Sequence, residues 1–214
     1  MLKTLHFHFN YDEFPREMGG KVKLLERDLD FFREFGYDEQ NVQNLEKLVN
    51  AFSDFPTDEE LEGDVMIATE KKNQLAEELR DFIKKVMVRV GLVFGYENPH
   101  YRKFGANNLS RLTDESLCRI GRRVPRIGII YLEKLKHTGL NEAELGRLAE
   151  LAGRFDEAME DKKNRMADRE IASAERADLA NRIYHEVSAL CNIGREIWKK
   201  KNEAKYNDYI LYDT

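Results

Sequence analysis

The feature that most constrains this chain is an apolar ladder from Leu61 to Val93, in which steps of three and four residues alternate. One charged residue interrupts it, and its members are Leu61, Val65, Ala68, Lys72, Leu75, Leu79, Phe82, Val86, Val90 and Val93. This spacing keeps apolar side chains on one side of an α-helix, close to the seam of a coiled coil. Thr57 and Glu60 precede the ladder with the spacing of a capping box. The sequence therefore predicts one long helix over 57–94, whose seam must be covered by other helices.

The chain before this helix predicts an extended arm followed by two shorter helices. Apolar and histidine side chains alternate at the start, in the order Leu5, His6, Phe7, His8 and Phe9. A period of two is typical of a strand or an extended arm, and we assign it to residues 1–17. From residue 18 the spacing becomes helical, so that three helices are expected over 18–95. Gly36 is placed to end the first of them and Asp38 to cap the second.

Residues 96–128 form the least regular stretch of the sequence. Within it, Thr113 is placed to cap a short helix, and Pro125 is expected to separate that helix from a following one that ends at Gly139. We therefore predict an irregular basic segment over 96–128, followed by long helices over 129–202.

The run that begins with a capping box at Asn141 contains no proline up to residue 202. Its apolar ladder is interrupted by charged residues at Lys162, Arg169 and Arg176. We predict that the chain turns back between 160 and 178; the alternative is a long helical hairpin that projects into solvent. The tyrosine-rich tail, 203–214, is expected to pack along the bundle or to pair with the N-terminal arm.

Taken together, these patterns predict an all-α fold: an antiparallel multi-helix bundle of about six helices, with a short extended N-terminal arm. We expect a single helical domain over 1–214. The composition of 35% charged and 42% hydrophobic residues suits long amphipathic helices. No apolar run is long enough to span a bilayer, and the N-terminus lacks a secretion signal. With two cysteines in 214 residues, the chain is expected to be cytoplasmic and reduced, without membrane contact.

The residues that commonly carry catalysis or bind metals do not form a recognisable motif. Helical bundles hold paired metals with Glu-x-x-His motifs, and the one match here, Glu97 with His100, contains a proline that disrupts the helical presentation. His6 and His8 are interpreted as the polar face of the arm. His185 has no nucleophile motif around it. We therefore expect no metal, no cofactor and no catalytic residue, and an enzyme is the least favoured class.

The charge distribution singles out one segment. The chain has a formal charge of −5, whereas residues 99–139 carry nine basic side chains against three acidic ones. The candidate binding residues are the arginines of this segment: Arg102, Arg111, Arg119, Arg122, Arg123 and Arg126. Arginine suits bidentate contacts with phosphate or carboxylate groups. Either these arginines form an exposed binding patch or, as we favour, they pair with acids on neighbouring helices.

A second charged stretch, 156–178, alternates acidic and basic side chains. We interpret it as a solvated, salt-bridged helical face. The alternative is a partner-binding tip or a surface for self-association.

The function that these features favour is that of a non-enzymatic helical interaction or scaffold protein, whose partner is another protein chain or a second copy of itself. The alternative is a phosphate or nucleic-acid binding module that uses the arginine-rich segment 102–126. The acidic net charge disfavours nucleic acid, since nucleic-acid binders are usually basic. Outward clustering of the arginines would indicate a binding role.

Overall fold

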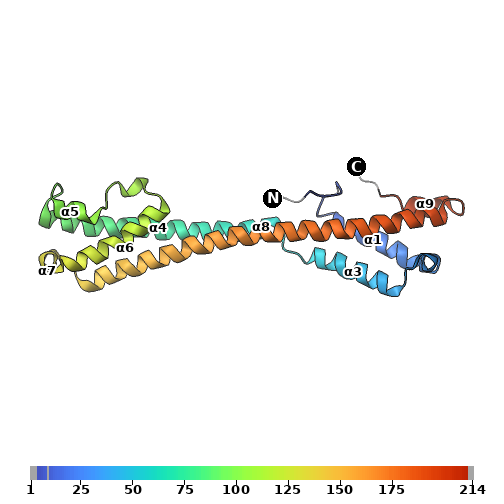
Figure 1. Ribbon diagram of the computed structural model, residues 1–214, viewed down its shortest axis with the longest axis horizontal. Helices are drawn as coiled ribbons and strands as arrows, with labels where there is room; N and C mark the ends of the chain where they lie inside the picture. Colours follow the sequence, from blue (N-terminus) through green and yellow to red (C-terminus); the bar gives the residue numbers. More distant parts are fainter. Residues whose placement is uncertain (1–3, 9, 212–214) are drawn as a thin grey trace. The chain divides into compact units, whose positions relative to one another are not determined.

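The computed structural model describes residues 4–8 and 10–211 and confirms the all-α fold class. No strand occurs in these two ranges. The helices shown in Figure 1 are α1 (Phe14–Arg27), α2 (Leu29–Phe32), α3 (Glu39–Ser53), α4 (Asp58–Phe94), α5 (Pro99–Phe104), α6 (Asp114–Ile130), α7 (Leu132–Leu135), α8 (Glu142–Trp198) and α9 (Glu203–Asp208). Short 3₁₀ turns lie at η1 (Arg33–Phe35), η2 (Leu109–Arg111) and η3 (Lys136–Thr138). None of the helices in the described part of the chain is long and apolar enough to cross a membrane.

The chain forms two compact units, where the sequence predicts a single domain. Unit 1 comprises Met1–Asp58 and Arg169–Thr214, and unit 2 comprises Glu59–Asp168. Each unit has its own hydrophobic core. Helix α8 contributes its first part to unit 2 and its last part to unit 1.

Unit 2 is organised around the predicted long helix, and the prediction of a helix over 57–94 is confirmed by α4. The seam residues Leu75, Leu79, Val86 and Val90 are buried in a core that they share with apolar residues of two other helices. These are Leu117 and Val124 of α6, and Leu145, Leu148 and Phe155 of α8. Lys72, the charged member of the ladder, is also buried, and its Nζ lies 2.5 Å from Asp114 Oδ2. Asp114 is the first residue of α6, where a helix favours negative charge. The ion pair explains how a lysine occupies a seam position.

The predicted turn between 160 and 178 is wrong, because α8 continues through this range without a break. Two of the three charged residues that interrupt the apolar ladder, Arg169 and Arg176, contact other side chains of unit 1. Arg169 donates to both carboxylate oxygens of Asp58, at 2.7 and 3.0 Å. The guanidinium of Arg176 lies over the rings of Tyr11 and Phe52, at 4.6 and 5.2 Å from their centroids. The interruption therefore marks a change in the surroundings of the helix and not its end.

The prediction of an irregular segment over 96–128 is also corrected, since α5 and most of α6 lie within it. Pro125 lies inside α6 and does not end it. An internal proline costs about 3 kcal/mol through a lost hydrogen bond and a clash. Burial of Pro125 itself, and of Val124 and Ile127 beside it, offsets that cost.

The chain termini differ in detail from the sequence prediction. Helix α1 begins at Phe14, within the expected arm, and Pro15 is compatible with the first turn of a helix. Phe9 lies outside the described residues, and Phe7 is buried in unit 1. The tail contains the short helix α9, followed by the fully buried Tyr209.

The predicted caps are confirmed, with backbone N–H groups donating to the side chains of Asp38, Thr113 and Asn141.

A buried carboxylate ties the end of the chain to α1 in unit 1. Asp28 follows α1 and accepts hydrogen bonds from Arg27, Trp198 Nε1, Lys205 Nζ and Tyr209 Oη, at 2.7 to 3.1 Å. Burial alone would raise the pKa of Asp28, but the hydrogen bonds from Arg27, Lys205 and Tyr209 outweigh it and lower the pKa to about 2. The folded state therefore favours the charged carboxylate.

Asp28→Asn is expected to lower the free energy of unfolding of unit 1 by about 2–4 kcal/mol at neutral pH, because an amide NH₂ would face donors that need an acceptor. The pKa of Asp28 is lower in the folded state, so its contribution is present above about pH 4 and is lost as the pH falls towards 2. The wild-type advantage should shrink over that range. Urea unfolding followed by fluorescence of Trp198, the one tryptophan, measures this. Asp30→Asn, at an exposed ion pair with Arg33, should cost under about 1 kcal/mol.

Candidate functional site

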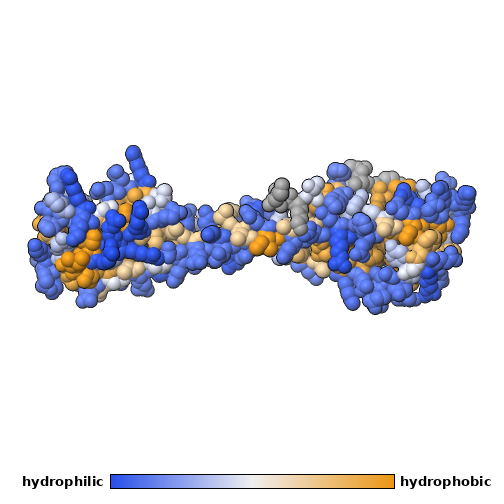
Figure 2. All heavy atoms as spheres, viewed as in Figure 1, coloured by the Kyte–Doolittle hydropathy of each residue, from blue (hydrophilic) through white to orange (hydrophobic). Residues whose placement is uncertain are grey.

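Four of the six candidate arginines meet on the exposed side of α6. Their spacing of three and four residues places Arg119, Arg122, Arg123 and Arg126 within about a third of the helix circumference. They line a groove of about 560 Å³ whose other lining residues are Glu115, Cys118, Asp156 and Met159. We call this surface the arginine groove. Figure 2 shows strongly hydrophilic side chains over this part of unit 2.

The arginines of the groove differ in how they are held. Arg122 Nη2 lies 2.6 Å from Asp156 Oδ2 on α8. The guanidinium of Arg123 packs against Gly105, whose φ of +68° ends α5, and this side chain is half-buried. Arg119 and Arg126 are exposed. Among residues 4–8 and 10–211, no carboxylate forms an ion pair with Arg119 or Arg126, so internal pairing accounts for only part of the set.

The other two candidate arginines lie outside the groove. Arg102, on α5, pairs with Glu97 at 2.6 Å, and both side chains are exposed. Arg111 belongs to η2 and is exposed. The arginine groove therefore contains only arginines of α6, and Arg102 and Arg111 do not contribute to it.

Two isoleucines continue the exposed side of α6 beyond the arginines. Ile129 is 47% exposed and Ile130 is 64% exposed. They lie three and four positions after Arg126, which places them on the same third of the helix circumference. We call the surface formed by Arg119, Arg122, Arg123, Arg126, Ile129 and Ile130 the α6 face. Sequence reasoning missed the isoleucines, although their spacing from Arg126 is visible once 114–130 is treated as one helix.

The cysteine in the groove is a protonated thiol. Cys118 Sγ donates to Asp156 Oδ1 at 3.4 Å. Burial, together with the neighbouring carboxylate of Asp156, raises the pKa of Cys118 to about 11. Burial likewise raises the pKa of Cys191, in unit 1, to about 11. Because the thiolate is the reactive form of cysteine, neither side chain is a nucleophile at neutral pH.

Both thiols are therefore expected to resist alkylation in the folded protein. At pH 7.5, iodoacetamide should modify Cys118 and Cys191 at least about a hundred-fold more slowly than a free cysteine, whose pKa is about 8.5. Urea should restore the ordinary rate by exposing both side chains. Peptide mass spectrometry over a time course gives the two rates separately. Rapid native labelling of Cys118 would show that its thiol is not held as described.

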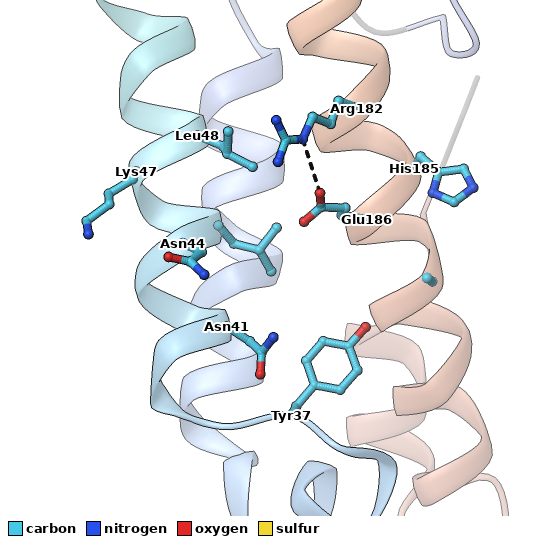
Figure 3. Close-up of a pocket in the computed structure, with 10 residues that line it drawn as sticks. Tyr37, Asn41, Asn44, Lys47, Leu48, Arg182, His185 and Glu186 are labelled. Atoms are coloured by element: carbon cyan, nitrogen blue, oxygen red, sulfur yellow. Dashed lines mark hydrogen bonds and ion pairs between the residues drawn. The ribbon is translucent and has the colours of Figure 1, made fainter.

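A second groove lies in unit 1 between α3 and α8, with a volume of about 690 Å³ (Figure 3). Several of its polar side chains already have partners in the chain. Arg182 Nε lies 3.4 Å from Glu186 Oε1, and Asn41 Oδ1 accepts from the backbone of Asp38 as part of a helix cap. Burial, with the charge of Glu186, raises the pKa of Tyr37. His185 lines this groove, but no serine or cysteine does so.

Metal ligands are not gathered in the part of the chain that the structure describes. No group of three or more His, Cys, Asp or Glu side chains there is arranged to hold a metal ion. His100, from the Glu-x-x-His match, lies 3.1 Å from the hydroxyl of Tyr131 through its Nδ1 atom. Family models, curated proteins and solved structures provide no match to this chain, so no residue role carries over from a relative.

Proposed function

We propose that the protein is a non-enzymatic helical interaction protein that binds another protein chain on the α6 face. The observation that carries this proposal is the continuity of exposed arginines and exposed isoleucines on one side of a helix. Arginine makes strong, directional bonds to carboxylates, and aliphatic side chains are stabilised by burial against an apolar partner. A partner helix with acidic and apolar residues on one side would satisfy both.

A phosphate group or a nucleic acid is the second candidate ligand, and only the guanidinium groups of the arginine groove support it. Two carboxylates, Glu115 and Asp156, lie within the groove, and Asp156 already pairs with Arg122. Unit 2 has 20 basic and 20 acidic residues, so it lacks the positive field typical of nucleic-acid binders. A phosphate backbone would also leave Ile129 and Ile130 without apolar contacts. These features favour a protein partner.

The cellular location that fits this proposal is the cytoplasm. Cys118 and Cys191 are free, buried thiols. A reducing compartment keeps such thiols in the state that the structure shows.

The proposal predicts a preference between two defined probes. Fluorescence anisotropy should show tighter binding of a helical peptide with Glu and Leu on one side than of an oligothymidylate of equal charge, at physiological salt. Arg119→Ala/Arg126→Ala should weaken peptide binding by about 5- to 30-fold, as expected for the loss of two contacts of about 0.5–1 kcal/mol each.

Arg154→Ala is the matched control, because Arg154 is an exposed arginine of unit 2 that does not line the groove. Its affinity for the peptide should equal that of the wild type. Tighter binding of the oligothymidylate would establish the phosphate alternative instead. Failure of both probes to bind would contradict a binding role for the α6 face.

A further inference from the structure

Helix α4 carries, on its exposed side, a surface that is complementary to the α6 face. The exposed residues opposite its buried seam are Met66, Ile67, Glu70, Gln74, Glu77, Glu78 and Asp81. Their spacing places them within about a third of the helix circumference. The exposed Lys71 borders this surface, and Lys84, which pairs with Asp81 at 2.9 Å, follows it on the same side of the helix with Lys85. Met66 is 66% exposed and Ile67 is 67% exposed. We call this surface the α4 face; like the α6 face, it belongs to unit 2.

The two faces match in the order of their residues. Along α6 the arginines come first and the isoleucines last, whereas along α4 the apolar pair comes first and the acids follow. An antiparallel alignment that sets Ile130 opposite Met66 brings Arg126 to Glu70 and Arg119 to Glu77, next to Glu78. Each surface extends for about 16 Å between these limits, at 1.5 Å per residue. Apolar then meets apolar, and base meets acid.

Within one copy, the two faces cannot meet. The opposite sides of both helices pack into the same core, where Leu79 of α4 lies against Gly121 of α6. Both faces are therefore turned away from that core. The complementary surface for each face must come from another molecule.

We infer that the α6 face of one copy binds the α4 face of a second copy of this chain. The inference rests on the proposed function and names the partner. It assigns the acid side of the contact to Glu70, Glu77 and Glu78, and the apolar part to Met66 and Ile67 with Ile129 and Ile130. Every copy presents both faces, so the contact is heterologous and either closes into a small ring or extends further.

The contact combines two interactions that respond differently to salt. Ion pairs between exposed side chains are screened by salt, with a Debye length of about 8 Å at physiological ionic strength. The apolar contact does not depend on screening. Self-association should therefore weaken as salt is added, but it should not disappear.

Sedimentation velocity of the full chain, over a range of concentrations and salt, tests the inference with charge-reversed variants. The wild type should form a species larger than the monomer. Arg119→Glu/Arg126→Glu and Glu70→Arg/Glu78→Arg should each raise the dissociation constant by at least about ten-fold, since like charges would then meet. An equimolar mixture of the two variants should recover wild-type affinity to within about three-fold, because the reversed charges pair again.

The control is Arg147→Glu/Arg154→Glu, which makes the same charge change at two exposed arginines of α8 that line neither groove. Its assembly should match the wild type, and circular dichroism should show native helix content in every variant. A wild type that stays monomeric would overturn the second copy as partner, while the peptide experiment would still decide the proposed function. An assembly that survives both reversals, or a mixture that fails to recover, would show that these two faces are not partners.

Discussion

Both hydrophobic cores depend on the uninterrupted course of α8. Its apolar positions Leu145, Leu148, Ala152 and Phe155 belong to the core of unit 2, and Ile183, Val187 and Leu190 belong to the core of unit 1. Between these sets, charged side chains replace apolar ones. Arg169 pairs with a carboxylate there, and the guanidinium of Arg176 lies over aromatic rings. The helix persists there because its backbone hydrogen bonds are internal to it, and because alanine, glutamate, lysine and arginine favour the helical state.

Helix α8 stays helical where it leaves a hydrophobic core, so a helix and a core are two separate predictions. This explains which parts of the fold the sequence predicts. Helix α4 is predictable because its caps, its seam and its length all agree, and the caps at Asp38, Thr113 and Asn141 depend only on local hydrogen bonds. The turn expected between 160 and 178 fails because a lost apolar period indicates a lost core, not a lost helix. Pro125 misleads for a related reason, since burial around it offsets a local cost.

The candidate site is predictable to the extent that it lies on one helix. Arg119, Arg122, Arg123 and Arg126 have the spacing of one helical face, and they share a groove once α6 is continuous. Arg102 and Arg111 belong to separate short elements, so nearness in sequence does not bring them to the groove. The exposure of Ile129, Ile130, Met66 and Ile67 depends on how the helices pack. Apolar residues of this kind look like core positions in the sequence alone.

The buried charged groups of this chain have partners, and in this they differ from the exposed charged groups on α6 and α4. Where a carboxylate is buried, the chain supplies donors, as four side chains do for Asp28. Where a lysine is buried, Asp114 pairs with it. Arg119 and Arg126 have no such carboxylate in the described part of their own chain, and Glu77 and Glu78 stand exposed on α4. Water can solvate all of these groups, but it does not favour the isoleucines beside them. Solvated charge beside exposed apolar residues is typical of interfaces, and the proposed contact rests on this combination and on the matching order of the residues.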